Sequence, residues 1–371
     1  MELYNSKTTF FSVALALLAI SYAYWTISRR LEVFGVGTVH TSVNTTRCYQ
    51  FGKGKRVRAK HWAHTGRRMC THANAISVRA QRKLPAAVDI PELQGCESIQ
   101  VDPRTGLAYM ACGNRAARQR WINPHEARTD GGEELRDHII VMDESNNLQD
   151  LSLVELERVG GTVAPFTQEL RVHGFDIYRD SLDPAMLTFM FVNHQQSGAG
   201  VSIFRHKVGT KFLWHVKTVK SPLLPSPNDV VATSHNTFYA TNDVRSTSKA
   251  MRGIEIVLGM PWGHVVHYNR AGQFSMAADR IPYANGIARS DDGNSVYVVA
   301  SSEPSVMIFR PASDGALAFV GKTAFRDFIP DNISVDPATG QVLVAGFLNT
   351  PEMFRYNREA LRGTTARSAG G

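Results

Sequence analysis

The sequence predicts an all-β protein with the repeated architecture of a β-propeller. A unit of two short strands joined by a turn recurs five times, at spacings of roughly 45 to 75 residues. In its clearest copy, residues 330–346, an acid and an amide precede an alternating strand, and an Asp-Pro-x-Thr-Gly turn leads into an apolar strand. These turn residues and this alternation are typical of β-hairpins. A series of such hairpins is the pattern expected of propeller blades.

A His, Glu, Asn or Asp stands just before the first strand in every copy. In a propeller the first strands line the central channel, so these side chains are expected to meet at one end of it. Asn and Asp are also ordinary turn residues, and for any single copy this explains their position equally well. Their recurrence in five copies favours a shared site. The residues expected to converge are Glu97, His173, Asn228, Asn285, Asp331 and Asn332.

In chain order, residues 1–30 come first and contain an apolar run, residues 10–27, closed by Arg29 and Arg30. This length lies between that of a signal-peptide core and that of a membrane helix. No small-x-small cleavage site follows, and Tyr22 and Trp25 near the end of the run are typical of a membrane interface. We therefore expect one N-terminal hydrophobic helix, an uncleaved signal anchor, rather than a cleaved signal peptide.

The orientation of this anchor stays open. Arg29 and Arg30 outnumber Lys7 and favour a cytosolic side for the rest of the chain, whereas the sequon at Asn44 is used only in the lumen. The expected location is a membrane of the secretory pathway, either the endoplasmic reticulum or the cell surface, with secretion as the alternative.

Residues 31–94 are expected to be a lumenal linker with a basic, irregular segment. Residues 47–85 contain eleven Lys and Arg residues and no Asp or Glu, while the whole chain carries +8. The other residues therefore carry a net charge of −3, so the basic character belongs to this segment. It is either a patch for nucleic acid or anionic lipid, or a solvated segment. The lack of any periodicity favours the solvated segment, and no nucleic-acid partner is expected.

Residues 95–357 are regular and form the predicted propeller domain, and residues 358–371 form a disordered polar tail. The best candidate for a helix is the segment 147–158. Nothing obvious supplies the remainder of a sixth blade. Further strands are expected at residues 139–142, 201–204, 212–219, 254–258, 264–268 and 305–309.

Four cysteines, Cys48, Cys70, Cys96 and Cys112, have spacings that fit no zinc motif. A disulfide is compatible with a secretory chain, but the sequence leaves the pairing open.

Several strings along the chain, taken together and in order, resemble the serum paraoxonase/arylesterase family. They are His173-Gly174-Phe175-Asp176, Val192-Asn193-His194, and the segments 224–232, 238–243, 284–287 and 331–337. The resemblance covers roughly residues 90 to 357. It implies a six-bladed β-propeller with two calcium ions in its channel, and hydrolysis of lactones and aryl esters. Because only five units are found, the last blade is expected to be incomplete.

The resemblance assigns a catalytic calcium ion to five residues of the repeated units. Two carboxylates and three amides form an all-oxygen set that suits a hard cation. Such an ion polarises the ester carbonyl as a Lewis acid and stabilises the oxyanion that forms. The five residues are Glu97, Asn228, Asn285, Asp331 and Asn332.

His173 and His194 match the histidine pair of the family. One would take a proton from the attacking water and the other would orient it or relay the proton, since imidazole titrates near neutral pH. The alternative is that one of the two is only a hydrogen-bonded wall of the channel.

Three departures from the family pattern affect these expectations. Ser98 stands where the family's structural calcium has an Asp, which leaves Asp229 and the backbone carbonyl of Phe175 for a weakened second ion. The C-terminal strands are missing, and Cys48 lacks the mate that closes the family's long disulfide. The basic segment also separates an expected N-terminal strand, residues 42–51, from Glu97.

Two functions follow from these observations. The first is a membrane-anchored, calcium-dependent hydrolase that acts on small aryl esters and lactones. The alternative is a calcium-binding propeller without catalysis, either a scaffold or a truncated product, and the missing C-terminal strands favour it.

Overall fold

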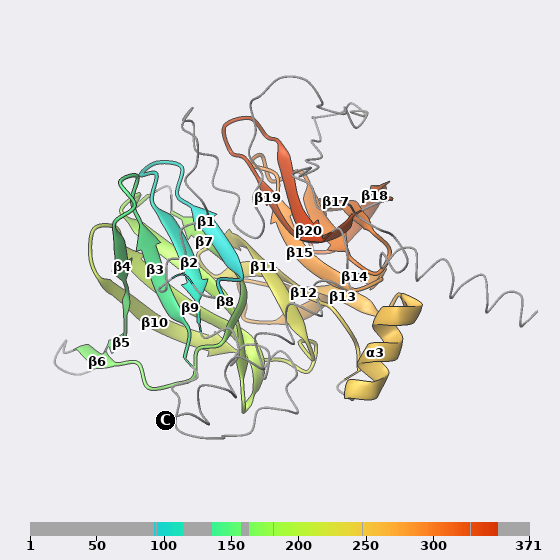
Figure 1. Ribbon diagram of the computed structural model, residues 1–371, viewed down its shortest axis with the longest axis horizontal. Coiled ribbons are helices and arrows are strands. Elements are labelled where there is room, and N and C mark those ends of the chain that lie inside the picture. Colours follow the sequence, from blue (N-terminus) through green and yellow to red (C-terminus); the bar gives the residue numbers. More distant parts are fainter. Residues whose placement is uncertain are drawn as a thin grey trace, which may run out of the picture.

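Nearly all regular elements in the computed structural model are β-strands, grouped into sheets that follow one another along the chain (Figure 1). The structure describes residue 93 and residues 95–347, except for 114–135, 157–162, 181, 247 and 327. The predicted anchor, the tail and almost all of the linker, with its sequon, Cys48 and Cys70, lie outside the described residues. Within the described part, no helix is long and apolar enough to span a membrane.

In every sheet except the second, the innermost strand comes first in the chain. The first sheet has the order β1-β2-β3-β4, with β1 (Ser98–Val101), β2 (Ala108–Cys112), β3 (His138–Met142) and β4 (Leu148–Asp150). The second has the order β6-β5-β10-β9-β8-β7, with β5 (Ser152–Leu156), β6 (Val163–Pro165), β7 (Val172–Arg179), β8 (Met186–Gln195), β9 (Gly198–Lys207) and β10 (Phe212–Val219). In this sheet β5 pairs with β10 in parallel, and all the other neighbouring strands are antiparallel.

The remaining sheets continue this pattern. The third has the order β11-β12-β13-β14, with β11 (Pro227–Ser234), β12 (Thr237–Asn242), β13 (Gly263–Tyr268) and β14 (Phe274–Ile281). The fourth has the order β15-β16-β17-β18, with β15 (Ala284–Arg289), β16 (Val296–Ala300), β17 (Ser305–Pro311) and β18 (Leu317–Ala324). The fifth consists of β19 (Ile329–Val335) and β20 (Val342–Phe347).

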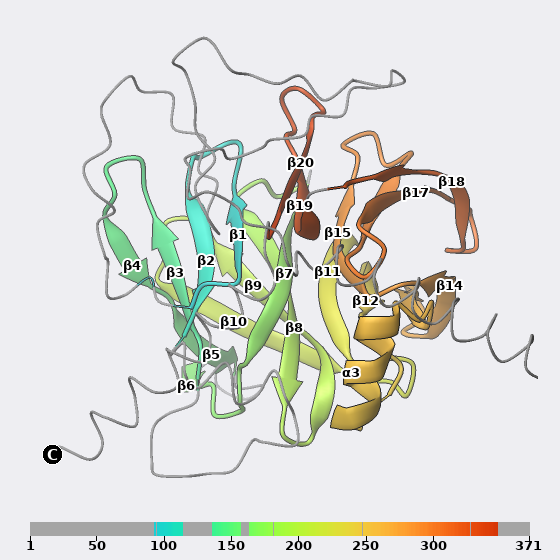
Figure 2. The same ribbon diagram turned by 45° about the vertical axis from the view of Figure 1, so that its right-hand side comes forward.

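The five first strands lie side by side in the order β1, β7, β11, β15 and β19. The amide Nδ2 of Asn332 donates to the backbone oxygen of Glu97 at 3.2 Å, which links the start of β19 to the start of β1. Figure 2 shows these strands side by side, with β1 and β7 on one side of β11 and with β15 and β19 nearby. The predicted all-β propeller is confirmed, with four blades of four or more strands and a fifth sheet of two strands within the described residues.

Apolar clusters fill the interfaces between consecutive blades. In β8, Phe189 and Phe191 face the first blade and pack with Tyr109, whereas Met190 and Val192 face the third blade. Because successive side chains of a strand point to opposite faces, a strand between two blades must be apolar on both. Two further clusters join the third blade to the fourth and the fourth to the fifth sheet.

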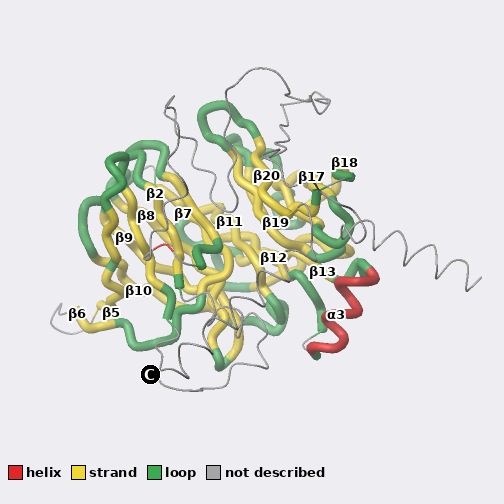
Figure 3. The backbone as a smooth tube through the Cα atoms, in the orientation of Figure 1, coloured by secondary structure: helices red, strands yellow, loops and turns green. Residues whose placement is uncertain are grey.

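All five predicted hairpins are confirmed, but two of the predicted elements are wrong. The segment 147–158 is not a helix, because residues 148–150 pair with β3 and residues 152–155 pair with β10. Residues 254–258 are not a strand but the end of α3 (Lys249–Leu258), shown in red in Figure 3. Gly259 ends this helix in the left-handed conformation (φ 61°), and the buried Glu255 carboxylate accepts the backbone N–H groups of Arg245 and Ser246. The Ile-Glu-Ile alternation is too short to distinguish these two states.

The cysteine pairing that the sequence left open is Cys96–Cys112. This disulfide joins the residue before Glu97 to the end of β2, and the side chain of Cys112 is buried. The disulfide therefore holds the backbone in place directly before Glu97, a candidate site residue.

Candidate functional site

Four of the five first strands have a β-bulge at the same place, and the bulge residues include most of the predicted site. In each bulge two residues oppose a single residue of the second strand, which bends the strand and redirects its side chains. The bulge residues are His173 and Gly174 in β7, Asn228 and Asp229 in β11, Asn285 and Gly286 in β15, and Asp331 and Asn332 in β19. Glu97 directly precedes β1.

Two of the bulge positions are glycines because neighbouring blades approach them closely. A Cβ atom on Gly174 would lie 2.0 Å from Oδ1 and 2.8 Å from Cα of Asp229. A Cβ atom on Gly286 would lie 2.7 Å from the backbone oxygen of Asp331. The absence of a side chain therefore lets the starts of the inner strands come together.

The second strand of each hairpin provides a partner for the first bulge residue. His194, Asp243 and Ser301 each follow the residue paired just before the bulge. They contact the bulge residues His173, Asn228 and Asn285, respectively. The sequence indicated only His194 of these three. The feature of the sequence that could have identified the other two is their position, because each is a polar residue at the end of an apolar second strand.

The histidine pair lies next to Glu97. Nδ1 of His173 lies 3.3 Å from Nε2 of His194, so one of these nitrogens donates to the other. On the other side of the same ring, Nε2 of His173 lies 3.8 Å from Oε1 of Glu97. The His173 side chain is 13% exposed and the Glu97 side chain 30% exposed, so the pair lies at the edge of solvent-accessible space.

Asp331 accepts a hydrogen bond from Asn285 and is close enough to Glu97 for the two carboxylates to repel each other. Its Oδ1 accepts a hydrogen bond from Nδ2 of Asn285 at 2.5 Å. Burial, together with the negative charge of Glu97, raises the pKa of Asp331 to about 7, although the Asn285 amide opposes this shift. Asn285 also donates to Ser301, whose hydroxyl donates to the backbone oxygen of Pro330.

Asn228 lies in the same row but is held by a different partner. Its Nδ2 lies 3.5 Å from Oδ2 of Asp243, a buried carboxylate that also accepts the hydroxyl of Ser226 at 2.5 Å. Because the amide nitrogen of Asn228 points toward Asp243, its amide oxygen points away from Asp243.

The oxygens predicted to bind a second, structural ion already accept hydrogen bonds from the protein. Both carboxylate oxygens of Asp229 accept backbone N–H groups, from Val230 at 2.8 Å and from Ile287 at 3.0 Å. Burial raises the pKa of Asp229 to about 7, and the charges of Asp176 and Glu97 add to this effect. The backbone oxygen of Phe175 accepts the side-chain amide of Gln100 at 2.9 Å, and Ser98 contributes no carboxylate.

The donors predicted for a catalytic ion do fit a hard cation. Among the described residues no group of three or more His, Cys, Asp or Glu side chains is arranged to hold a metal, but this set combines two carboxylates with three amides. The mutual repulsion of Glu97 and Asp331 is an interaction that a positive ion would relieve. Carboxylate and amide oxygens are the ligands that calcium prefers.

The chain is similar in sequence to serum paraoxonases. The chain is 29% identical over 265 residues to serum paraoxonase/arylesterase 1 of Mus musculus, which covers 71% of this chain and 70% of the relative. It is 31% identical over 272 residues to serum paraoxonase/lactonase 3 of Homo sapiens, which covers 73% and 71%. Among solved structures, a luciferin-regenerating enzyme has a TM-score of 0.42 and 14% identity, covering 70% of this chain and 72% of that one.

The family comparison extends over most of the propeller. A family model described as Arylesterase matches residues 132–365, from before β3 to beyond β20. This match includes all the first strands except β1, together with every bulge described above. The resemblance predicted from the motifs is therefore confirmed, and the chain belongs to the arylesterase family.

Proposed function

We propose that the protein is a calcium-dependent hydrolase of carboxylic esters, acting on aryl esters and lactones. The observation that carries this proposal is the set of four aligned bulges, together with Glu97, beside a histidine pair 3.3 Å apart. The relatives named arylesterase and lactonase support ester hydrolysis as the reaction class.

The calcium ion would be held by side chains from three first strands, β11, β15 and β19, and from the residue before β1. These are Glu97, Asn228, Asn285, Asp331 and Asn332. Calcium bound there supplies Lewis-acid polarisation of the ester carbonyl. The carboxylates provide charge, and the hydrogen bonds from the Asn228 and Asn285 amides to Asp243 and Ser301 fix the orientation of those amides.

His173 would act as the general base. Nε2 of His173 is the nitrogen that faces Glu97, so it is the atom placed to take a proton from water. For Nε2 to accept, the ring proton must lie on Nδ1, and Nδ1 then donates to Nε2 of His194. Protonation of His173 creates a cation that the Glu97 carboxylate stabilises. His194 would hold the tautomer and accept the relayed proton.

We also propose a six-bladed ring, anchored in a membrane of the secretory pathway through residues 1–30. In the part of the chain that the structure describes, the fifth sheet has two strands. That two-stranded sheet is also the observation in favour of the second candidate function, a calcium-binding propeller that acts as a scaffold without turnover.

Replacing Asp331 or Asn285 by Ala in the full chain tests the metal assignment. We expect calcium affinity, measured by titration calorimetry, to fall by more than about a hundredfold, and phenyl acetate hydrolysis to be lost. Removing a residue that only hydrogen-bonds a metal ligand typically lowers metal affinity by about tenfold to a hundredfold, and removing the ligand itself should lower it further. The exposed Asn294 lies in the same blade as Asn285, and Asn294→Ala is the matched control. If both variants keep normal affinity and turnover, these residues do not bind the ion.

A further inference from the structure

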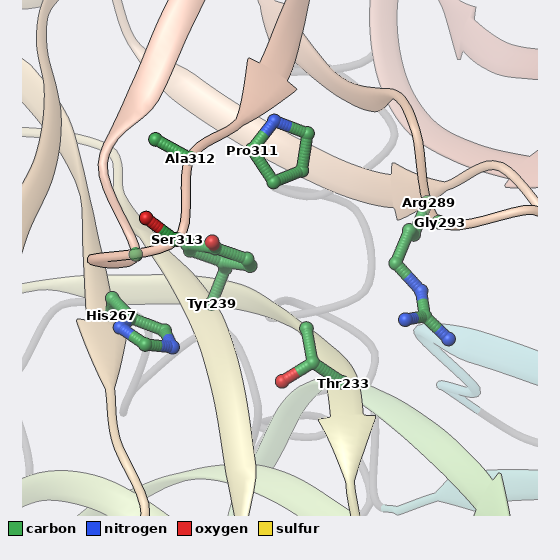
Figure 4. Close-up of a pocket in the computed structure, with 9 residues that line it drawn as sticks. Thr233, Tyr239, His267, Arg289, Gly293, Pro311, Ala312 and Ser313 are labelled. Atoms are coloured by element: carbon green, nitrogen blue, oxygen red, sulfur yellow. The ribbon is translucent and has the colours of Figure 1, made fainter.

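A second set of polar side chains lines a cavity at the opposite ends of the strands that carry Asn228 and Asn285. The cavity has a volume of about 240 Å³ and lies between the third and fourth blades (Figure 4). Thr233 is five residues beyond Asn228 on β11, and Arg289 is four residues beyond Asn285 on β15. At about 3.3 Å per residue, the cavity is roughly 15 Å from the candidate active site.

Two polar groups of this cavity are hydrogen-bond donors that the protein itself leaves unused. The guanidinium of Arg289 and the hydroxyl of Tyr239 form no hydrogen bond or ion pair with any residue that the structure describes. Nδ1 of His267 is buried and also lacks a hydrogen-bond partner there. Two unused donors from two strands, those of Arg289 and Tyr239, thus line one space, which is the arrangement expected of a ligand site rather than of a packing defect.

The cavity also has flat apolar walls. The rings of Tyr239 and His267 lie 4.8 Å apart at an angle of 31°, and Pro311 contributes another apolar surface. Gly315, in the turn after β17, has a φ of +88°, and a Cβ atom there would lie 2.0 Å from Nδ1 of His267. Glycine therefore lets this turn close over the imidazole.

Among the residues that the structure describes, Arg289 is the only cationic side chain that lines the cavity. Two carboxylates, those of Asp176 and Asp314, interact electrostatically with Arg289 or with its neighbours in the cavity. Both already accept hydrogen bonds from backbone N–H groups. The carboxylate of Asp176 accepts the backbone N–H groups of Ile177 and Ala232, and Asp314 accepts that of Ala316 at the exposed rim. Burial lowers the pKa of His267 and raises the pKa of Tyr239, so near neutral pH the imidazole is uncharged and the hydroxyl keeps its proton.

We propose that this cavity binds a small carboxylate attached to a flat ring, about the size of benzoate. A guanidinium pairs with a carboxylate through two parallel hydrogen bonds, and the Tyr239 hydroxyl supplies a further donor. The ring of the ligand packs between Tyr239 and Pro311. A volume of about 240 Å³ lies below the range of roughly 300 to 1,000 Å³ that is typical of sites for drug-sized ligands, so the ligand is expected to be small. This site is separate from the candidate active site and does not depend on the proposed hydrolysis.

Titration of the full chain with sodium benzoate tests this assignment, with benzamide as the uncharged comparison. We expect saturable binding of benzoate, weakened about tenfold or more by Arg289→Ala because a charge-assisted hydrogen bond is lost. Tyr239→Phe removes one donor without breaking any hydrogen bond to a described residue, and it should weaken binding by about threefold to tenfold. Benzamide should bind more weakly than benzoate.

Arg310→Ala is the matched control, because Arg310 is exposed and adjacent to Pro311 but does not line the cavity. It should change benzoate affinity by less than about twofold. Thermal melting of each variant checks folding, and Tyr239→Phe keeps the test valid if Arg289→Ala does not fold. Equal benzoate affinity in the wild type and Tyr239→Phe, or an equal loss in Arg289→Ala and Arg310→Ala, would overturn the proposal. Absence of saturable binding by the wild type would overturn it as well.

Discussion

Nδ1 of His173 lies 3.3 Å from Nε2 of His194, and these two rings belong to paired strands, β7 and β8. His173 is a bulge residue and His194 follows the residue that pairs just before the bulge. The bulge therefore creates the pair, because in a regular ladder consecutive residues of β7 would alternate between the two faces. The same construction aligns Asn228 with Asp243 and Asn285 with Ser301.

Replacement of His173 by Gln should lower kcat for phenyl acetate by roughly a hundredfold to ten-thousandfold, which is the range for loss of a general base. His194→Gln should have a smaller effect, since His194 acts through His173. Calcium affinity should be unchanged in both variants, and the exposed His235→Gln is the control. Full turnover by His173→Gln would mean that His173 is only a wall of the channel.

Gly174→Ala should destabilise the protein by about 1 to 3 kcal/mol, because the added methyl group would collide with Asp229 of the next blade. Gly321→Ala in β18 is the matched control, because a Cβ atom there meets nothing within 4 Å. Denaturant unfolding followed by circular dichroism compares the two. Equal stability of both variants would show that the blades do not approach each other at Gly174 as described.

The five hairpins and the convergence of their polar residues follow from the sequence because each copy combines alternation with a turn signal. The bulges do not, since Asn285-Gly286 and Asp331-Asn332 differ in residue type while having the same geometry. The partners Asp243 and Ser301 were missed because their role depends on strand register. The segment 254–258 was misassigned because Glu255 is buried through hydrogen bonds to backbone N–H groups of the loop before α3, which a local pattern does not reveal.

The pH dependence of stability should contain a distinct contribution from His206. Burial among the aromatic rings of the first two blades lowers the pKa of His206, so the unfolded chain takes up this proton first as the pH falls. The stability that neutral His206 supports is therefore present above about pH 6.5 and is lost below it.

Comparison of the wild type with His206→Gln isolates this contribution. The raised pKa values of Asp229 and Asp331 act in the opposite direction, favouring the folded state as the pH falls, but they are common to both proteins. Urea unfolding at pH 7.5 and pH 5 should show a larger loss of stability in the wild type than in His206→Gln. An equal loss in both proteins would mean that His206 does not titrate as described.

The most direct test of the hydrolase assignment is the rate at which the full chain hydrolyses phenyl acetate and a five- or six-membered lactone. The rate is measured with calcium, then with excess chelator, and then after calcium is restored. We predict that hydrolysis disappears with the chelator and returns with calcium, because in our proposal the carboxylates of Glu97 and Asp331 bind the ion that the reaction requires. Folded, calcium-binding protein that hydrolyses neither substrate would contradict the account and support the non-catalytic scaffold.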